Sequence, residues 1–134
     1  MAQSKVTSAQ WALAFTATVG KDDVGNDVVI DVPPGFVLMD ALLVVDVAFD
    51  GTTPTAALAD NKASPTSIIA SGALTVGAKT MVTAAKGTFY PSGGKLTLNP
   101  RVASGTVTTG SARLIVQGVV MGRQNERFGT SVAT

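Results

Sequence analysis

Apolar and polar side chains alternate with a period of two along much of this chain, which is typical of β-strands with one buried face. In residues 10–19 the odd positions carry the bulkier apolar side chains Trp11, Leu13, Phe15, Ala17 and Val19. In residues 111–121 the even positions form an apolar face of Ala112, Leu114, Val116, Gly118 and Val120. We therefore predict a half-buried strand near each end of the chain.

The longest alternating segment covers residues 36–49. All of its odd positions are apolar, and we predict that they face the core: Val37, Met39, Ala41, Leu43, Val45, Val47 and Phe49. The even positions mix Leu38, Leu42 and Val44 with two aspartates, Asp40 and Asp46. An apolar patch with an aspartate at each end suits burial against another surface, so this second face is a candidate contact surface.

Further short strands are predicted between these segments, at residues 27–32, 68–76, 80–84, 87–90 and 95–99. Residues 56–60 could form one helical turn, and the Pro- and Gly-containing residues 91–94 predict a hairpin. About eight short strands without a long helix predict an all-β, antiparallel sandwich or barrel. We expect one domain over residues 1–134, with an N-terminal arm (1–9) and an exposed C-terminal tail (124–134).

The composition removes most means of catalysis. The chain has 134 residues with no histidine and no cysteine, and it carries 10 Lys and Arg against 9 Asp and Glu. Charged residues make up 14% of the chain, whereas a soluble domain usually carries about 25%. We interpret this deficit as a surface that is coated with Thr, Ser and Gly or covered by other chains. An enzyme is not expected, and no cofactor is implied.

Other binding functions have weak support. The net charge of +1, with basic residues scattered along the chain, gives no case for direct binding of nucleic acid. No apolar run approaches the roughly 18 residues of a membrane helix. Asp22, Asp23, Asn26 and Asp27 are the best metal candidates, but their spacing does not match a calcium loop, so a solvated turn is the default and no metal site is assigned.

Several segments occur in an order that resembles the small jelly-roll decoration, or cement, proteins of tailed bacteriophage capsids. These segments follow the N-terminal strand: the entry Val32-Pro33-Pro34-Gly35-Phe36, the loop Asp50-Gly51-Thr52-Thr53-Pro54, the turn Tyr90-Pro91-Ser92-Gly93-Gly94 and the strand ARLIVQGVVMGR at 112–123. The likeness covers most of residues 10–123 and rests on overall pattern. It implies an antiparallel β-sandwich of jelly-roll type, and it assigns no catalytic residue, cofactor or metal ligand.

The resemblance also implies a role. We expect a structural virion protein that lies on the capsid surface, is made in the cytoplasm of the bacterial host, and forms homodimers or homotrimers that bind the major capsid protein and stabilise the shell. The candidate interface residues lie on the second faces of the strands at 36–49 and 111–121 or at and after the end of the last strand: Leu38, Leu42, Val44, Arg113, Ile115, Arg123, Arg127 and Phe128.

Two alternatives stay open. The chain could be another virion component, such as a tail or fibre subunit or a self-assembling coat protein. It could also be a carbohydrate-binding β-sandwich, in which Trp11 would be an exposed platform for sugar stacking. The position of Trp11 in the apolar register favours packing in the core instead.

Overall fold

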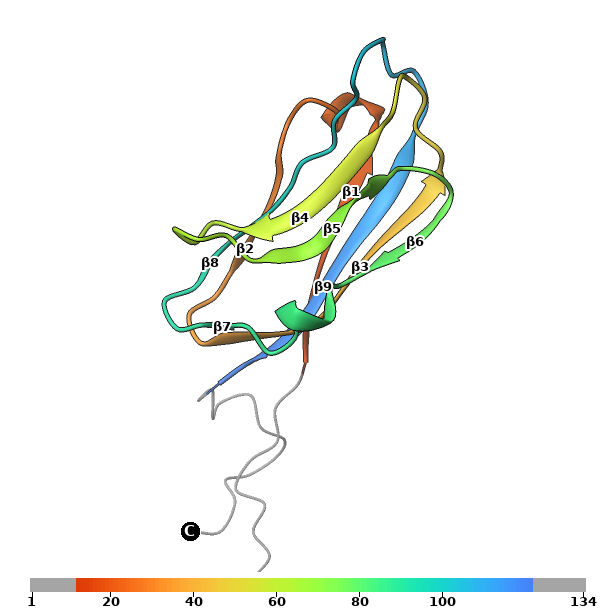
Figure 1. Ribbon diagram of the computed structural model, residues 1–134. Helices are drawn as coiled ribbons and strands as arrows, with labels where there is room; N and C mark the ends of the chain where they lie inside the picture. The colour runs from red at the N-terminus through yellow and green to blue at the C-terminus, as the bar shows by residue number, and fades with distance from the viewer. Residues whose placement is uncertain (1–11, 122–134) are drawn as a thin grey trace, which may run out of the picture.

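The computed structural model describes residues 12–121, which form a sandwich of two antiparallel sheets (Figure 1). Its strands, in chain order, are β1 (Leu13–Gly20), β2 (Val28–Val32), β3 (Phe36–Val47), β4 (Thr55–Asp60), β5 (Ser67–Ala73), β6 (Gly77–Thr80), β7 (Phe89–Tyr90), β8 (Gly94–Leu98) and β9 (Ser111–Val120). Two 3-10 turns accompany them, η1 (Lys21–Asp23) and η2 (Thr83–Ala85). No helix in this described part of the chain is long and apolar enough to cross a membrane.

The strand order is that of a jelly roll. One sheet has the order β1-β9-β3-β6, with the two-residue β7 also paired to β3, and the other has the order β2-β8-β4-β5. Apart from β7, the chain pairs like a long hairpin folded over on itself: β1 with β9, β2 with β8, β3 with β6 and β4 with β5. This nested pairing defines the jelly roll. The predicted all-β antiparallel sandwich of jelly-roll type is therefore confirmed.

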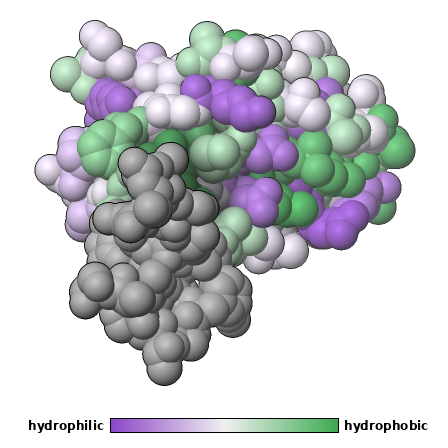
Figure 2. Space-filling view, turned by 90° about the horizontal axis from the view of Figure 1, so that it is seen from below, coloured by the Kyte–Doolittle hydropathy of each residue, from purple (hydrophilic) through white to green (hydrophobic). Residues whose placement is uncertain are grey.

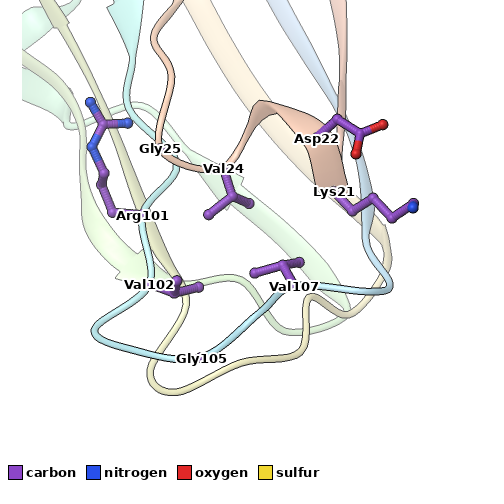
Figure 3. A pocket seen from close by; sticks show the side chains of 8 residues that line it. All are labelled: Lys21, Asp22, Val24, Gly25, Arg101, Val102, Gly105 and Val107. Carbon is purple, nitrogen blue, oxygen red and sulfur yellow. The ribbon is translucent and has the colours of Figure 1, made fainter.

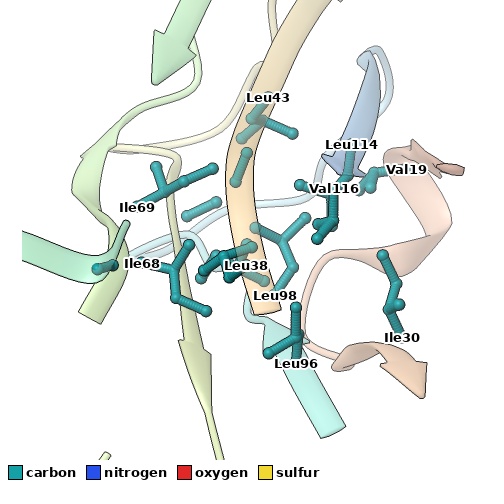
Figure 4. Packing of buried hydrophobic residues seen from close by; sticks show 14 of the residues in the cluster. Val19, Ile30, Leu38, Leu43, Ile68, Ile69, Leu96, Leu98, Leu114 and Val116 are labelled. Atoms are coloured by element: carbon teal, nitrogen blue, oxygen red, sulfur yellow. The ribbon is translucent and has the colours of Figure 1, made fainter. Parts of the chain in front are cut away.

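Inward-facing side chains of the two sheets fill the space between them (Figure 4). The five-stranded sheet contributes fully buried residues that include Leu38, Leu43, Leu114 and Val116. The four-stranded sheet contributes Leu58, Ile68, Leu96 and Leu98. Each such side chain stabilises the fold by about 1.5–3 kcal/mol relative to an exposed position. The predicted inner face of residues 111–121 is confirmed, because its even positions are buried.

Strand β3 contains a β-bulge between Leu38 and Asp40 that reverses which positions are buried. Before the bulge Phe36 and Leu38 point into the core, and after it the odd positions from Ala41 to Val45 do so. An extra residue in one strand moves every later side chain to the opposite face of the sheet, because side chains alternate with a period of two.

Two predictions for this segment are therefore wrong. Val37, Met39 and Val47 are not core residues: Val37 is half-buried and pairs with the exposed Phe89 on the outer face, and Met39 and Val47 are 43% and 49% exposed. Val47 follows a second register shift, between Val45 and Val47. Leu38 is 0% exposed, so it is part of the core and not of the second, contact-forming face on which the sequence pattern placed it. Leu42 and Val44 follow the bulge and lie on the outer face as expected.

The helical turn predicted for residues 56–60 is also wrong, because this segment is strand β4. Its side chains Ala56, Leu58 and Asp60 are buried, which is a period of two. Alanine and leucine favour helix in isolation, but pairing of this segment with β5 on one side and β8 on the other outweighs that preference.

The hairpin predicted around residues 91–94 is likewise replaced by a crossing between sheets. Strand β7 pairs with β3 in one sheet, whereas β8 pairs with β2 and β4 in the other. Gly93 makes the crossing possible, because it has a φ of 78° and a Cβ there would lie 2.7 Å from the carbonyl oxygen of Val32. The strand predicted at 80–84 is instead the end of β6 followed by η2.

Candidate interaction surface

The outer face of the five-stranded sheet is the surface on which the sequence placed most of its contact residues. Pairing aligns Thr16, Ile115, Leu42 and Thr80 in one row across β1, β9, β3 and β6. The next row consists of Thr18, Arg113, Val44 and Ala78. Leu42, Val44 and Ile115 are half-buried by their neighbours, so their outer sides are open to contact. We call these two rows the outer patch.

The charged member of the outer patch, Arg113, is paired with Asp46, which lies next to the patch on β3. Nε and Nη2 of Arg113 donate hydrogen bonds of 2.9 Å each to the two carboxylate oxygens of Asp46. These hydrogen bonds, together with the attraction of the Asp46 charge, raise the pKa of Arg113. Asp40 turns its Oδ1 to the N–H of Ala41. A protein partner would therefore meet an apolar and threonine-rich surface with a compensated ion pair.

A hollow of about 460 Å³ lies along the β1 side of the outer patch. It is lined by Thr16, Ala17, Thr18, Arg113 and Ile115. The lining has hydroxyl groups and methyl groups but no carboxylate and no strong base other than the paired guanidinium. It suits side-chain packing better than catalysis.

The outer face of the four-stranded sheet is different in character. Asp31 of β2 and Lys95 of β8 are cross-strand neighbours and form an exposed ion pair with a distance of 2.6 Å. Next to them the register places Val29 beside Thr97 and Ala59. This face has one large exposed apolar side chain, Val29, which is 47% exposed. The outer patch instead has three half-buried large apolar side chains, Leu42, Val44 and Ile115.

The structure brings together four of the eight candidate interface residues. Leu42, Val44, Arg113 and Ile115 all belong to the outer patch. Leu38 does not, for the reason given above. The remaining three candidates, at positions 123, 127 and 128, lie outside the described residues, as does the tryptophan at position 11.

A third apolar row was missed in the sequence. Val37 pairs with Val119 on one side and with Phe89 on the other, and the Phe89 side chain is 48% exposed. The alternation of residues 111–121 already placed Val119 on the outer face. Phe89 could not be placed, because the predicted hairpin assigned β7 to the wrong neighbour.

This row lies towards the end of the sandwich where β1 begins and β9 ends. Figure 2 shows that end, with apolar side chains in groups between polar ones. Met121, just after β9, is 58% exposed. The exposed polar pair Asp40 and Gln117 separates this row from the outer patch.

A second hollow, of about 360 Å³, lies near the opposite end of the sandwich. Val24, Val102 and Val107 converge in it, while the charged ends of Lys21 and Arg101 extend away from its centre (Figure 3). Asp22 also lines this hollow, beside Lys21, so charged groups surround the three valines.

Two of the three aspartates considered as metal candidates, Asp23 and Asp27, have side-chain partners within the protein. Asp23 accepts a hydrogen bond of 2.7 Å from the N–H of Gly20, and Asp27 pairs with Arg101 at 2.6 Å. Among residues 12–121 no three acidic, histidine or cysteine side chains cluster closely enough to hold a metal ion. In the folded protein Asp23 therefore stabilises the turn after β1, and Asp27 belongs to a surface ion pair.

Comparison of the sequence with known protein families and with curated protein sequences finds no match. The fold is similar to that of a chain from the capsid of Ralstonia phage GP4, with a TM-score of 0.57. The likeness covers 91% of each chain, and the sequences are 17% identical. At this identity the comparison concerns the fold, which the two chains share over nearly their whole length.

Proposed function

We propose that this chain is a structural protein of a bacteriophage virion and that it serves as a capsid decoration, or cement, protein. The observation that carries the proposal is the jelly-roll fold that it shares, over 91% of both chains, with a chain from a phage capsid. The absence of histidine and cysteine from the sequence supports a non-enzymatic role. The low content of charge fits a protein whose surface is covered by neighbours in an assembly.

The physical role of such a protein follows from linkage. A protein that binds the assembled shell but not the free subunits stabilises the shell by mass action. The outer patch supplies a suitable surface, because Leu42, Val44 and Ile115 present apolar area and Arg113 is already paired with Asp46. Contact with the major capsid protein would bury this area without leaving an unpaired charge.

The direct test is binding to preformed shells. Shells assembled from the major capsid protein of the same phage would be mixed with this protein, sedimented, and heated in a calorimeter. The expected result is co-sedimentation at a fixed stoichiometry and a higher melting temperature of the shell. A protein that stays in the supernatant and leaves the melting temperature unchanged contradicts the proposal.

Electron microscopy of the purified protein alone tests the main alternative within the virion. A decoration protein is expected to remain as small particles, because it needs the shell as a template. Closed shells, tubes or fibres formed by this chain alone would instead identify a coat, tail or fibre subunit.

A further inference from the structure

Strand β1 is an open edge of the five-stranded sheet. It pairs with β9 over eight consecutive residues, without a bulge, from Leu13 opposite Gly118 to Gly20 opposite Ser111. Within the described residues no second strand pairs with it. An edge strand offers every second N–H and C=O to another chain, and a long, regular and uncharged edge is a site of association.

The other three edges carry features that hinder pairing. Strand β6 has four residues and includes Lys79. Strand β2 has five residues, carries Asp31 and is followed by two prolines. Strand β5 has register shifts against β4, and the carbonyl oxygen of its Ile68 accepts a hydrogen bond of 2.7 Å from the N–H of Val82.

Strand β1 is longer than β6 and β2, and among the described residues a hydrogen bond occupies its edge only at its last residue, from the N–H of Gly20 to the carboxylate of Asp23. Its sequence, LAFTATVG, contains no charged residue and no proline. Its inward side chains are also incompletely covered: Leu13, Phe15 and Ala17 pack against the core but remain partly exposed. On the neighbouring β9 the inward side chains are all buried. The inward side chains of β1 therefore remain partly exposed at this edge of the sandwich, and a further strand paired with β1 would cover them.

We infer that β1 pairs with β1 of a second copy of this chain, antiparallel, about a two-fold axis near Thr16 and Ala17. Such an interface is isologous, with the same surface used by both partners. The pairing would join the two five-stranded sheets edge to edge into one continuous sheet. The two outer patches would then lie side by side on a single surface.

The chemistry of β1 favours a second copy as the occupant of this edge. In an antiparallel pair of β1 strands related by a two-fold axis, even positions lie opposite even positions. Thr16 and Thr18 then lie opposite threonines or Ala14 of the second copy, and the inward side chains of the two strands contact one another. Cross-strand threonine pairs are favourable. A strand with charges would meet like charges when paired with itself, whereas β1 has none.

The test uses two exposed threonines at opposite ends of the same row. Thr16 lies on the β1 edge and Thr80 on the β6 edge, joined through Ile115 and Leu42. The full-length protein is expected to have twice the chain mass of 13.5 kDa by light scattering. Both Thr16→Lys and Thr16→Asp should halve that mass, because like charges would meet near the axis. Thr80→Lys should leave the dimer intact.

Mixing the two monomeric variants provides the sharper result. Thr16→Lys and Thr16→Asp should together restore the dimer mass, because opposite charges then face each other across the axis. Hydrogen exchange should show protection of the β1 amides in the wild-type dimer and its loss in either variant alone. A single cooperative urea transition and a circular dichroism spectrum like that of the wild-type protein show that the fold of a monomerised variant is intact.

A monomeric or trimeric wild-type protein overturns this inference. A dimer that survives both Thr16 substitutions, or that Thr80→Lys breaks, also overturns it, as does failure of the mixed variants to associate. These outcomes are separate from the proposed function. A monomer that still co-sediments with capsid shells would refute the β1 dimer and leave the decoration role in place.

Discussion

The phenolic hydroxyl of Tyr90 donates a hydrogen bond of 2.9 Å to the carboxylate of Asp60 inside the sandwich. Tyr90 ends β7 in one sheet and Asp60 ends β4 in the other, so this bond ties the two sheets together. Asp60 also accepts hydrogen bonds from the N–H groups of Thr66 and Lys62, at 2.8 and 3.3 Å. Burial, and then the contact with Asp60, raise the pKa of Tyr90.

Removal of this hydroxyl should destabilise the protein without changing its shape. Tyr90→Phe leaves one oxygen of a buried carboxylate without its partner, and a hydrogen bond to a charged group contributes about 1.5–3 kcal/mol. Urea denaturation should show a loss of this size in the free energy of unfolding. Phe89→Tyr adds a hydroxyl to the exposed neighbouring ring and should change stability by less than about 0.5 kcal/mol. Equal effects of the two substitutions would contradict the assigned role.

The stability should fall in acid because of two aspartates with lowered pKa values. At Asp60 burial raises the pKa, but the hydrogen bonds from Thr66, Tyr90 and Lys62 together outweigh it, so the net direction is downward. At Asp50 the hydroxyl of Thr108, and then the N–H of Thr109, lower the pKa from 3.8 to about 2. Asp50 and these threonines connect the loop after β3 to the loop before β9.

The direction in which the free energy of unfolding changes with pH follows from the difference in pKa between the folded and unfolded states. A carboxyl whose pKa is lower in the folded state contributes stability above its unfolded pKa, and that stability disappears as the pH falls through the folded value. Urea midpoints should therefore drop between about pH 4 and about pH 2. The Asp50→Ala variant should show a smaller drop across this range than the wild-type protein. An identical pH profile for the variant would contradict the contribution of Asp50.

Gly118 is expected to tolerate no side chain. It lies on the inner face of β9, where an added Cβ would collide with the carbonyl oxygen of Val37 and would lie 2.5 Å from the ring of Phe36. Gly118→Ala should lower the free energy of unfolding by about 3 kcal/mol or more, because the backbone of a neighbouring strand must move. Gly20→Ala, whose Cβ would meet no atom closer than 3.9 Å, is the matched control. A small effect at Gly118 would contradict this packing.

The outer patch should determine binding to capsid shells. Ile115→Asp places an unpaired charge at the centre of the patch, and we expect it to weaken co-sedimentation at least about tenfold, which corresponds to 1.4 kcal/mol. Val29→Asp makes the same change on the outer face of the other sheet and should leave binding unchanged. Both positions lie on solvent-facing sides of strands, so circular dichroism should show an intact fold. The reverse order of effects would place the docking surface on the four-stranded sheet.

Much of the fold could be predicted from alternation alone. The inner face of residues 111–121 and the inward odd positions of β1 follow directly from the period of two, because each of these strands is regular along its whole length. Four members of the outer patch were identified in the same way, since Leu42, Val44, Arg113 and Ile115 occupy the opposite face of regular segments. Local pattern is sufficient where a strand has no irregularity.

The alternation of apolar and polar residues gave wrong predictions where pairing with a neighbouring strand determined which side chains are buried or whether a segment is a strand. The bulge near Met39 depends on how β3 fits against β9, and it moved Leu38 from the predicted surface into the core. Residues 56–60 have helix-forming side chains, yet β5 and β8 hold them as a strand. Neither effect has a signal within a few residues of the segment concerned.

By itself, then, the sequence determined that this chain is an all-β protein with two-faced strands, little charge and no histidine or cysteine chemistry, because periodicity and composition are local properties. A resemblance between segments implied a jelly roll, but only the tertiary structure decided which strands pair to form it, that the outer patch gathers residues from four strands, and that β1 is left as the open edge. Those features depend on which distant strands form hydrogen bonds with each other, and such contacts between residues far apart in the chain are made only when it folds.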